Sequence, residues 1–326
     1  MLRSLRIAAL VVTAAFAVAA PVAALAQAYP SKPVTIIVPW PPGGPSDIAA
    51  RPIAEGLSKY LGRPFVIENR EGAGGNTGTA LVAMAPPDGY TLLISSSAPI
   101  VINPSLYKNM PYDPQRDLVP ITGLLRVPLV LAVHPSVPAR NLQELLAHIK
   151  AQRGTFRYAS AGNGTPQHLT AELLGTVATL EMAHVPYAGS APAIADLLAG
   201  RVPMMFDSTV AIVAHLKSGK LRPIAVTGAR RAVELPAVPT FAEAGVKGVE
   251  SYAWYGLFAR AGTPPDIVRA LNAETIRVMR GPEFQSVLRA TGSEYTGDTP
   301  DNFARFIRDE ADKWAVIVKA SRATVD

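Results

Sequence analysis

The fold is decided by residues 34–51, which read VTIIVPWPPGGPSDIAAR. The β-branched run Val34–Val38 predicts a buried strand, the prolines and glycines end it sharply, and Ser46 or Asp47 suits the N-cap of a following helix. Glycines let the backbone approach a ligand closely, and the first N–H groups of a helix attract negative charge. This stretch therefore predicts an anion pocket, with an ordinary packing turn of an α/β domain as the alternative. The candidate ligand-contacting residues of this first loop are Trp40, Pro42, Gly43, Gly44, Ser46 and Asp47.

The chain begins with a predicted export signal. Two arginines precede an apolar run over residues 7–20, and a proline and an Ala-Leu-Ala triplet follow it. We predict that residues 1–26 are a signal peptide, cleaved after Ala26 or Ala28, and that the exported protein works in the bacterial periplasm. A retained membrane anchor is the alternative, which the proline and the lack of a flanking charge cluster disfavour.

Composition excludes several classes of function. The sequence has 31 basic and 25 acidic residues, and loss of the two signal-peptide arginines leaves a net charge of about +4. This mild charge favours anionic ligands, but the basic residues are scattered, so we expect no nucleic-acid partner. There is no cysteine, which excludes thiol catalysis, thiolate metal sites and iron–sulfur clusters. We expect no cofactor and no metal, because His134, His148, His184 and His215 are isolated in the sequence and lack metal-ligand spacing.

Length and pattern predict two lobes of α/β structure. About 300 exported residues exceed what one hydrophobic core usually covers. β-rich runs alternate with amphipathic segments, which predicts parallel sheets with helices on both faces, and the chain becomes mostly helical after about residue 257. The predicted strands are 34–38, 65–68, 91–95, 127–133, 156–159, 183–185, 204–206 and 221–226; the predicted helical segments include 48–60, 142–150, 168–174 and 194–198.

Two extended stretches, residues 124–133 and 249–258, are suited to run from one lobe to the other and back. We therefore predict a first lobe from residues 27–125 together with the mostly helical 251–326, and a second lobe from residues 126–250. A ligand would lie in the cleft between them, where the glycine-containing loops meet.

A second loop, EGAGGNTGT at residues 71–79, invites a nucleotide-binding interpretation. The interpretation fails because the loop lacks the lysine of a P-loop and the glycine spacing of a dinucleotide fingerprint. Asn76 is the candidate here, either as the cap of the next helix or as an amide offered to a ligand.

A third loop, YASAGNGTPQHL at residues 158–169, repeats the pattern of a glycine turn that feeds a helix. Thr165 fits an N-cap and Pro166 the first helical position. A catalytic triad of Ser160, His168 and Asp207 is the enzymatic alternative, disfavoured because Tyr158 stands where a nucleophile elbow needs glycine. Two such helix N-termini, from this loop and the first, could hold one anion together.

A fourth loop, HVPYAGSAPAI at residues 184–194, is again a strand, a turn of small residues and a helix. Gly189, Ser190 and Ala191 are its candidate binding residues, beside Tyr187. Asp207, at the end of the strand 204–206, would face the same cleft, where it would orient a hydroxyl, receive an amine or cap the next helix.

These loops together resemble the Bug family, the periplasmic substrate-binding proteins of tripartite tricarboxylate transporters. The resemblance covers nearly the whole exported chain, with the motifs in the same order. The motifs are PWPPGG (39–44) with Asp47 and Arg51, ENR (68–70) with GAGGN (72–76), YASAGNGTPQHL (158–169), VPYAGSAP (185–192), LLAG (197–200), AVT (225–227) and VPTFAEAG (238–245).

The resemblance implies a two-lobed, type II-like periplasmic binding fold, with a cleft between two mixed or parallel sheets, that closes on a small carboxylate. It implies that the ligand contacts the first loop from Trp40 to Asp47, then Asn76, then Ser160, Asn163, Gly164, Thr165 and His168 of the third loop, then Gly189 to Ala191, and Asp207. Trp40 departs from the Phe or Tyr more common in the family, and Pro45-Ser46 lies in a variable region, so the class of ligand is better defined than its identity.

We therefore predict a monomeric, non-enzymatic receptor for a mono-, di- or tricarboxylate, aliphatic or aromatic. Its partners would be one large and one small membrane transport subunit, or alternatively a sensor kinase. The remaining alternative is a periplasmic Ser/His/Asp hydrolase.

Overall fold

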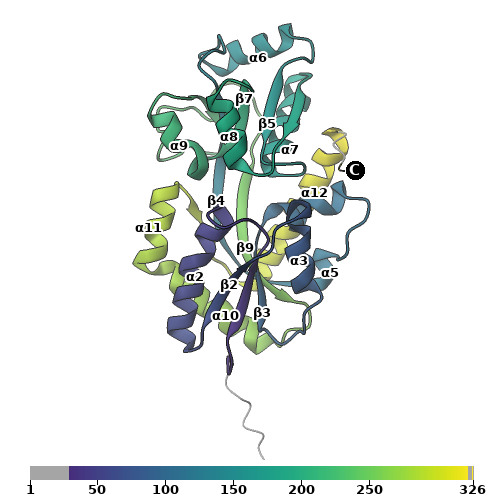
Figure 1. Ribbon diagram of the computed structural model, residues 1–326, viewed down its shortest axis with the longest axis vertical. Helices are drawn as coiled ribbons and strands as arrows, with labels where there is room; N and C mark the ends of the chain where they lie inside the picture. Colours follow the sequence, from purple (N-terminus) through teal and green to yellow (C-terminus); the bar gives the residue numbers. More distant parts are fainter. Residues whose placement is uncertain (1–28, 322–324, 326) are drawn as a thin grey trace, which may run out of the picture.

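The structure, a computed structural model, describes residues 29–321 and 325. The predicted signal peptide and both proposed cleavage positions lie outside the described residues. Two halves are stacked along the long axis and joined by long strands (Figure 1). No helix in residues 29–321 is both long enough and apolar enough to cross a bilayer.

The lower half contains a parallel three-stranded unit. Strand β1 (Val34–Val38) lies between β2 (Phe65–Asn69) and β3 (Thr91–Ser96) and pairs with each in parallel. Val34, Ile36 and Val38 are fully buried, as expected for a β-branched run covered on both faces. The helical elements of this part are α2 (Pro45–Leu61), η1 (Ala73–Gly75), α3 (Asn76–Ala83), η2 (Ala98–Ile102), α4 (Asn103–Leu106) and α5 (Pro114–Asp117).

The upper half repeats the alternation of strands and helices. The elements of this half are α6 (Leu142–Ala151), β5 (Arg157–Ser160), α7 (Pro166–Ala178), β6 (Ala183–Pro186), α8 (Ser190–Leu198), β7 (Met204–Ser208), α9 (Thr209–Lys217) and β8 (Arg222–Val226). Strand β5 pairs in parallel with β6 and β7.

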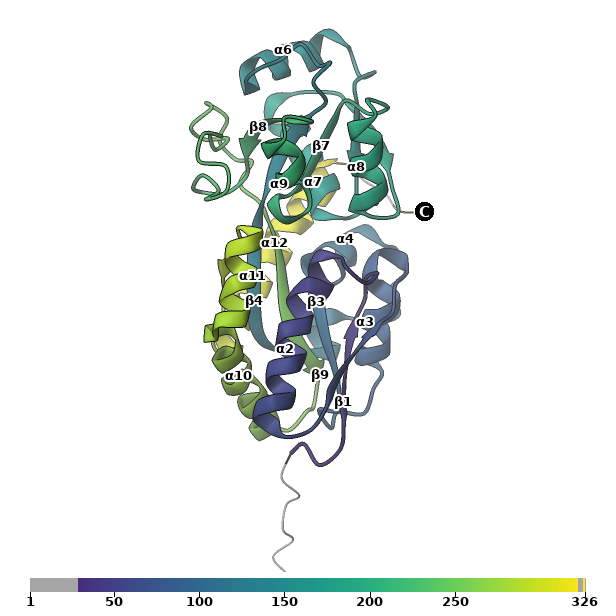
Figure 2. The ribbon, with the colours of Figure 1, turned by 60° about the vertical axis from the view of Figure 1, so that its left-hand side comes forward.

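Strands β4 (Leu118–Val133) and β9 (Tyr252–Arg260) run between the halves (Figures 1 and 2). The first part of β4 pairs antiparallel with β9, and residues 129–133 pair antiparallel with β7 and β8. One ten-stranded sheet results, in the order β2-β1-β3-β9-β4-β7-β5-β6, with β8 and β10 (Glu294–Tyr295) also paired to β4. The two-lobed α/β fold is thus confirmed. The pairing is mixed, within the prediction of mixed or parallel sheets: the strands inside each half pair in parallel, and the strands that cross between the halves pair antiparallel. The lobe boundaries themselves stay a prediction.

The C-terminal segment returns to the lower half as α10 (Pro265–Arg280) and α11 (Pro282–Thr291), and α12 (Pro300–Ser321) runs from there up to the upper half (Figure 1). Helix α12 packs against η2 and β4 and also against α7 of the upper half. The buried indoles of Trp254 in β9 and Trp314 in α12 both donate hydrogen bonds to Oε2 of Glu310, at 3.0 and 3.1 Å. One carboxylate therefore connects the last helix to a strand that joins the halves.

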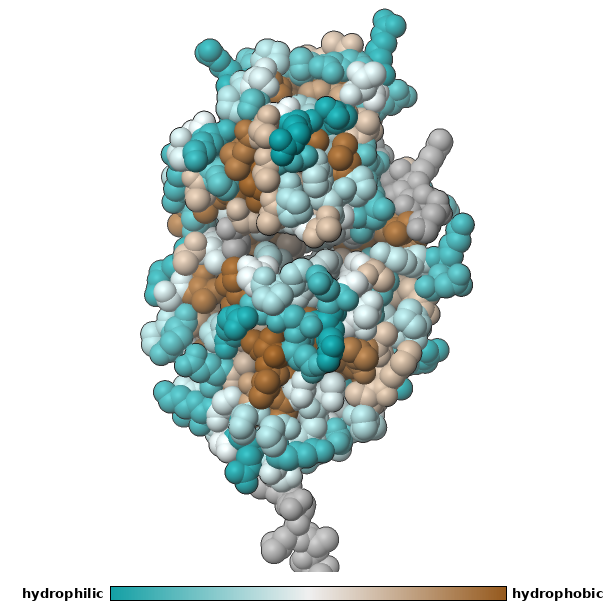
Figure 3. Space-filling model, viewed as in Figure 1, coloured by the Kyte–Doolittle hydropathy of each residue, from teal (hydrophilic) through white to brown (hydrophobic). Residues whose placement is uncertain are grey.

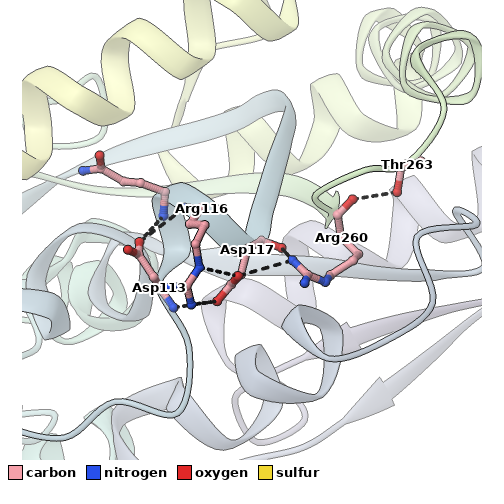
Figure 4. A network of polar contacts seen from close by, with 6 residues as sticks. Asp113, Arg116, Asp117, Arg260 and Thr263 are labelled. Atoms are coloured by element: carbon pink, nitrogen blue, oxygen red, sulfur yellow. Dashed lines mark hydrogen bonds and ion pairs between the residues drawn. The ribbon is translucent and has the colours of Figure 1, made fainter.

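A second polar network fixes the start of β4 (Figure 4). Asp117 accepts hydrogen bonds from the guanidinium of Arg116 and from the backbone N–H of Asp113, and it pairs with Arg260 at the end of β9. The Arg116 hydrogen bond, followed by that from Asp113, lowers the pKa of Asp117 to about 2. The carboxylate is therefore ionised at neutral pH and connects α5 to β9.

Candidate ligand-binding site

A cavity of about 530 Å³ lies between the two halves, where Figure 3 shows the surface hollowed. It is walled by the β1–α2 loop from below, by the β5–α7 and β6–α8 loops from above, and by residues of β3 and β9. Its lining is Trp40 to Ser46, Ile48, Ser96, Ala161, Thr165 to Gln167, Ala188 to Pro192, Ile194, Ala211, Ala253 and Tyr255. Among the described residues that form this lining, Tyr255 alone has an ionisable side chain, so this part of the wall has no formal cation.

The first loop confirms the predicted strand, turn and helix, but neither Ser46 nor Asp47 caps the helix. Helix α2 begins at Pro45 with Gly44 as its N-cap, because the fixed φ of proline suits the first helical position. Asp47 lies further into the first turn. Its carboxylate accepts the backbone N–H of Gly43 at 2.9 Å, Arg51 Nε at 2.8 Å and Asn69 Nδ2 at 3.2 Å.

Asp47 therefore holds the loop in shape and does not line the cavity. Burial alone would raise its pKa, but the hydrogen bonds from Gly43, Arg51 and Asn69 outweigh burial and hold the pKa below its ordinary value. The charge of Asp47 is thus compensated within the loop. An arriving anion meets the helix N-terminus and not a bare carboxylate.

Three helices direct their N-termini at the cavity. The lining contains the first residues of α2 (Pro45 and Ser46), of α7 (Pro166 and Gln167) and of α8 (Ser190 and Ala191). The first N–H groups of a helix have no acceptor within the helix, and the helix dipole adds partial positive charge there. Gly43 and Gly44 of one half and Thr165 of the other converge on the same space, as the anion-pocket interpretation requires.

The β5–α7 loop confirms Thr165 as N-cap and Pro166 as the first helical residue, with the Thr165 hydroxyl accepting the N–H of His168 at 3.4 Å. His168 Nδ1 accepts the N–H of Gly164 at 3.1 Å, and its ring stacks on that of His184 with centroids 3.8 Å apart. His184 Nε2 lies 2.7 Å from Ser160 Oγ. His184, which seemed isolated in the sequence, is therefore half-buried and stacks on the buried ring of His168.

The catalytic-triad interpretation is wrong, because the three side chains have other partners. Ser160 pairs with His184 and not with His168, whereas Asp207 bonds to Gln167 and Ser190. Burial lowers the pKa of His168 to about 3 and that of His184 to about 4, so both rings are neutral at physiological pH. In the described part of the chain, no three His, Cys, Asp or Glu side chains gather in a way that would hold a metal ion.

The capping roles considered for Asp207 and Asn76 were also wrong. Helix α9 begins at Thr209 with Ser208 as N-cap and no side-chain cap, while Asp207 is fully buried behind the cavity wall. Helix α3 begins at Asn76 itself, after Gly75, so Asn76 cannot be the N-cap. Its Oδ1 instead accepts hydrogen bonds from Asn103 Nδ2 at 2.7 Å and from the Tyr112 hydroxyl at 2.8 Å.

The structure brings together nine of the sixteen candidate residues along the cavity wall: Trp40, Pro42, Gly43, Gly44, Ser46, Thr165, Gly189, Ser190 and Ala191. The other seven lie outside the lining: Asp47, Asn76, Ser160, Asn163, Gly164, His168 and Asp207. Their role in binding stays a prediction.

Sequence reasoning missed three polar lining residues: Ser96, Gln167 and Tyr255. Gln167 follows Pro166 directly, so its place in the first turn of a helix that faces the cavity was a usable signal. Ser96 ends β3 and Tyr255 lies within β9. No local pattern in the sequence marks either of them as facing a cavity.

Comparison with known proteins places the chain in a family. The model of the tripartite tricarboxylate transporter family receptor matches residues 49–322. Protein BugT of Bordetella pertussis is 40% identical over 309 residues, which cover 94% of each chain. The structure of R. palustris Rpa4515 with adipate has a TM-score of 0.85 at 36% identity, covering 91% of this chain and 99% of that one.

The structure of MatC from Rhodopseudomonas palustris with bound malate has a TM-score of 0.82 at 32% identity, covering 89% of this chain and 100% of that one. The long match to the family model and the full-length similarity to BugT establish the relationship independently of the ligands. This chain is a member of the tripartite tricarboxylate transporter receptor family, related to the Bug proteins, and its family consists of substrate-binding proteins rather than enzymes.

Proposed function

We propose that this protein is a periplasmic receptor that captures a small carboxylate and delivers it to the membrane subunits of a tripartite tricarboxylate-type transporter. The observation that carries the proposal is the convergence of three helix N-termini on one cavity whose lining has no basic side chain. Such a wall suits a carboxylate, which backbone N–H groups bind without a salt bridge.

Neutral donors suffice for useful affinity. A hydrogen bond to a charged group contributes about 1.5–3 kcal/mol, and a sheltered helix terminus up to about 2 kcal/mol. Micromolar binding needs about 8 kcal/mol, so four or five such contacts leave a surplus for domain closure and lost ligand freedom. The related proteins solved with adipate and malate hold ligands of the proposed class.

Calorimetric titration tests the ligand class, with adipate, malate and succinate compared against their diamides. We expect binding of at least one dicarboxylate and none of its diamide. Preference for the diamides would contradict the proposal. Mass spectrometry of small molecules that copurify with the protein would identify the natural carboxylate.

A matched pair of variants tests where the anion lies. Ala191 lies in the first turn of α8, is solvent-exposed and lines the cavity, so it tolerates larger side chains. Ala191→Glu and Ala191→Gln differ in charge and little in size. At 4–6 Å, a like charge costs about 1–3 kcal/mol at intermediate dielectric, so Glu should bind the carboxylate about 5- to 150-fold more weakly than Gln. Equal affinities would place the anion elsewhere.

We further propose that the lobes comprise residues 27–125 with 251–326, and residues 126–250, and that they close on the ligand about β4 and β9 near Arg126 and Tyr252. Small-angle scattering should show compaction with saturating ligand. Unchanged scattering would argue against closure.

Copurification tests the identity of the partner. A tagged receptor should copurify with the membrane transport subunits, whereas copurification with a sensor kinase would favour the signalling alternative.

A further inference from the structure

Asp207 is a buried carboxylate that forms no ion pair with any residue that the structure describes. It has no exposed surface, and within that part of the chain its Oδ2 has no hydrogen-bond partner. Its Oδ1 accepts three hydrogen bonds, from Gln167 Nε2 at 3.0 Å, Ser190 Oγ at 3.2 Å and the backbone N–H of Ser208 at 2.8 Å. A buried charge is costly unless it is compensated, so an incompletely paired carboxylate at this place calls for a functional explanation.

Two of the three donors belong to the cavity wall. Gln167 and Ser190 both line the cavity, whereas Asp207 lies directly behind them. Ser190 has one hydroxyl hydrogen, and Asp207 uses it, so the hydroxyl offers the cavity its lone pairs. Gln167 commits one of its two amide hydrogens to Asp207 and keeps the other hydrogen together with its carbonyl oxygen. The Ser190 hydroxyl is therefore a hydrogen-bond acceptor in the wall, while the backbone N–H groups of the helix N-termini are donors.

We propose that Asp207 is a positioning residue that makes the cavity prefer carboxylates bearing an additional hydrogen-bond donor, a hydroxyl or an ammonium group, over plain dicarboxylates. The inference rests on the proposed function, because it assigns a preference to that same site. A donor on the ligand would meet Ser190 Oγ, and the negative charge behind Ser190 strengthens that contact. A plain dicarboxylate would bring a second negative charge toward Asp207 with no donor to offset it.

The surroundings of Asp207 determine when it is charged. Its hydrogen-bonding neighbours come from α7, α8 and the start of α9, and the titratable group that faces it is Tyr255 of β9. Burial raises the pKa of Tyr255 first, and the charge of Asp207 raises it further, so the phenol is neutral. Burial raises the pKa of Asp207 to about 6, against the lowering effect of its three hydrogen bonds. Asp207 is thus ionised above about pH 6 and neutral below it.

The test measures a selectivity ratio. The ratio is the affinity of the intact protein for a hydroxy or amino dicarboxylate divided by its affinity for the plain dicarboxylate of the same length. Malate and aspartate are compared with succinate, and 2-hydroxyadipate and 2-aminoadipate with adipate. The variants are Asp207→Asn, which removes the charge at nearly constant volume, and Ser208→Ala. The second is the control, because it removes a neighbouring buried hydroxyl and keeps the backbone N–H that Asp207 uses.

We expect Asp207→Asn to lower the ratio about tenfold for the hydroxy acids and more for the amino acids, with plain dicarboxylates bound as tightly as before or more tightly. A ligand group next to Ser190 would lie roughly 6 Å from Asp207, where charges still interact strongly at intermediate dielectric. Ser208→Ala should leave the ratio unchanged. In the wild type the ratio should fall as the pH drops through 6, and this pH dependence should vanish in Asp207→Asn.

An unchanged ratio in Asp207→Asn, or an equal loss of affinity for all ligands, would overturn this inference and leave the carboxylate receptor intact. Failure of the wild type to bind any carboxylate would instead overturn the proposed function. If Asp207→Asn does not fold, the pH profile of the wild-type ratio decides, and a ratio that is flat from pH 5 to 8 contradicts the inference.

Discussion

Replacing Gly164 with alanine should weaken ligand binding, although Gly164 is not part of the cavity lining. Gly164 lies in the β5–α7 loop of the upper half with φ of +74°. A Cβ atom here would overlap with Cδ2 of Leu106 and would lie 3.1 Å from Oδ1 of Asn103. Both residues belong to α4, which lies in the lower half beneath α7 and α8 (Figure 2). The added methyl group would therefore collide across the junction of the halves.

The substitution has two free-energy costs, one that applies in any arrangement of the halves and one that applies only when the halves meet. The left-handed backbone conformation costs about 1–2 kcal/mol for any residue with a Cβ, whether or not the halves are closed. Overpacking a buried contact costs about 1–3 kcal/mol, but only when the halves meet. Leu106 is only 6% exposed, so it cannot swing into solvent to relieve the overlap. If ligand binding closes the halves as seen here, Gly164→Ala should lose about 5- to 150-fold in affinity.

Gly154→Ala is the matched control. Gly154 has φ of +83°, and its added Cβ would lie 3.4 Å or more from Glu181, which is ordinary contact far from the junction. Urea unfolding without ligand should show similar destabilisation of both variants, whereas calorimetric titration should show weaker binding for Gly164→Ala alone. Wild-type affinity in Gly164→Ala would refute the reasoning, because the ligand-bound state would then not contain this contact.

Three further predictions concern stability. Glu310→Leu leaves two buried tryptophan indoles without an acceptor and should cost about 2–5 kcal/mol in urea unfolding, whereas Glu310→Gln keeps one acceptor oxygen and should cost less. Because the pKa of Asp117 is lowered to about 2, its stabilising contribution is present above pH 4 and is lost as the pH falls toward 2. The melting temperature of Asp117→Asn should therefore vary less than that of the wild type between pH 4 and pH 2. His168 and His184 have folded-state pKa values of about 3 and 4, below the unfolded value near 6.5. The free energy of unfolding should therefore fall as the pH drops from 6.5 to 4, by up to about 1.4 kcal/mol per pH unit for each histidine. His184→Gln should flatten that slope in pH-dependent unfolding, and an unchanged slope would exclude His184 as its source.

Much of the secondary structure was predictable because it depends on local pattern. Strand β1 matches the predicted residues 34–38, and the other seven predicted strands lie within, or one residue beyond, their observed bounds. Pro166, Pro265 and Pro300 each open a helix, as the rule for proline at the first helical position requires. The antiparallel pairing of β4 with β9 was not predictable, because the two strands are more than 100 residues apart and nothing local specifies their relative direction.

The errors in the site share one physical cause. Asp47, Asn76 and Asp207 are all polar residues near a helix start, where side-chain caps are common, but each bonds to another partner: Arg51 in the same helix for Asp47, and residues distant in the sequence for Asn76 and Asp207. Arg51 can be found by its spacing of four residues from Asp47. Asn103 and Gln167 lie 27 and 40 residues from the groups they bind, so only the assembled fold identifies them.

If the proposed function holds, the class of ligand and the preference within that class depend on different parts of the cavity. The anion-attracting part of the cavity consists of backbone N–H groups at three helix starts, and glycines and prolines in the loops set their direction. Side chains around those loops can change while the backbone keeps its path. This explains how relatives of 36% and 32% identity, solved with adipate and with malate, retain one fold with TM-scores above 0.8. If the proposed function holds, preference among carboxylates would come from the side chains that complete the wall, and we propose that the buried charge behind Gln167 and Ser190 biases that choice without altering the backbone.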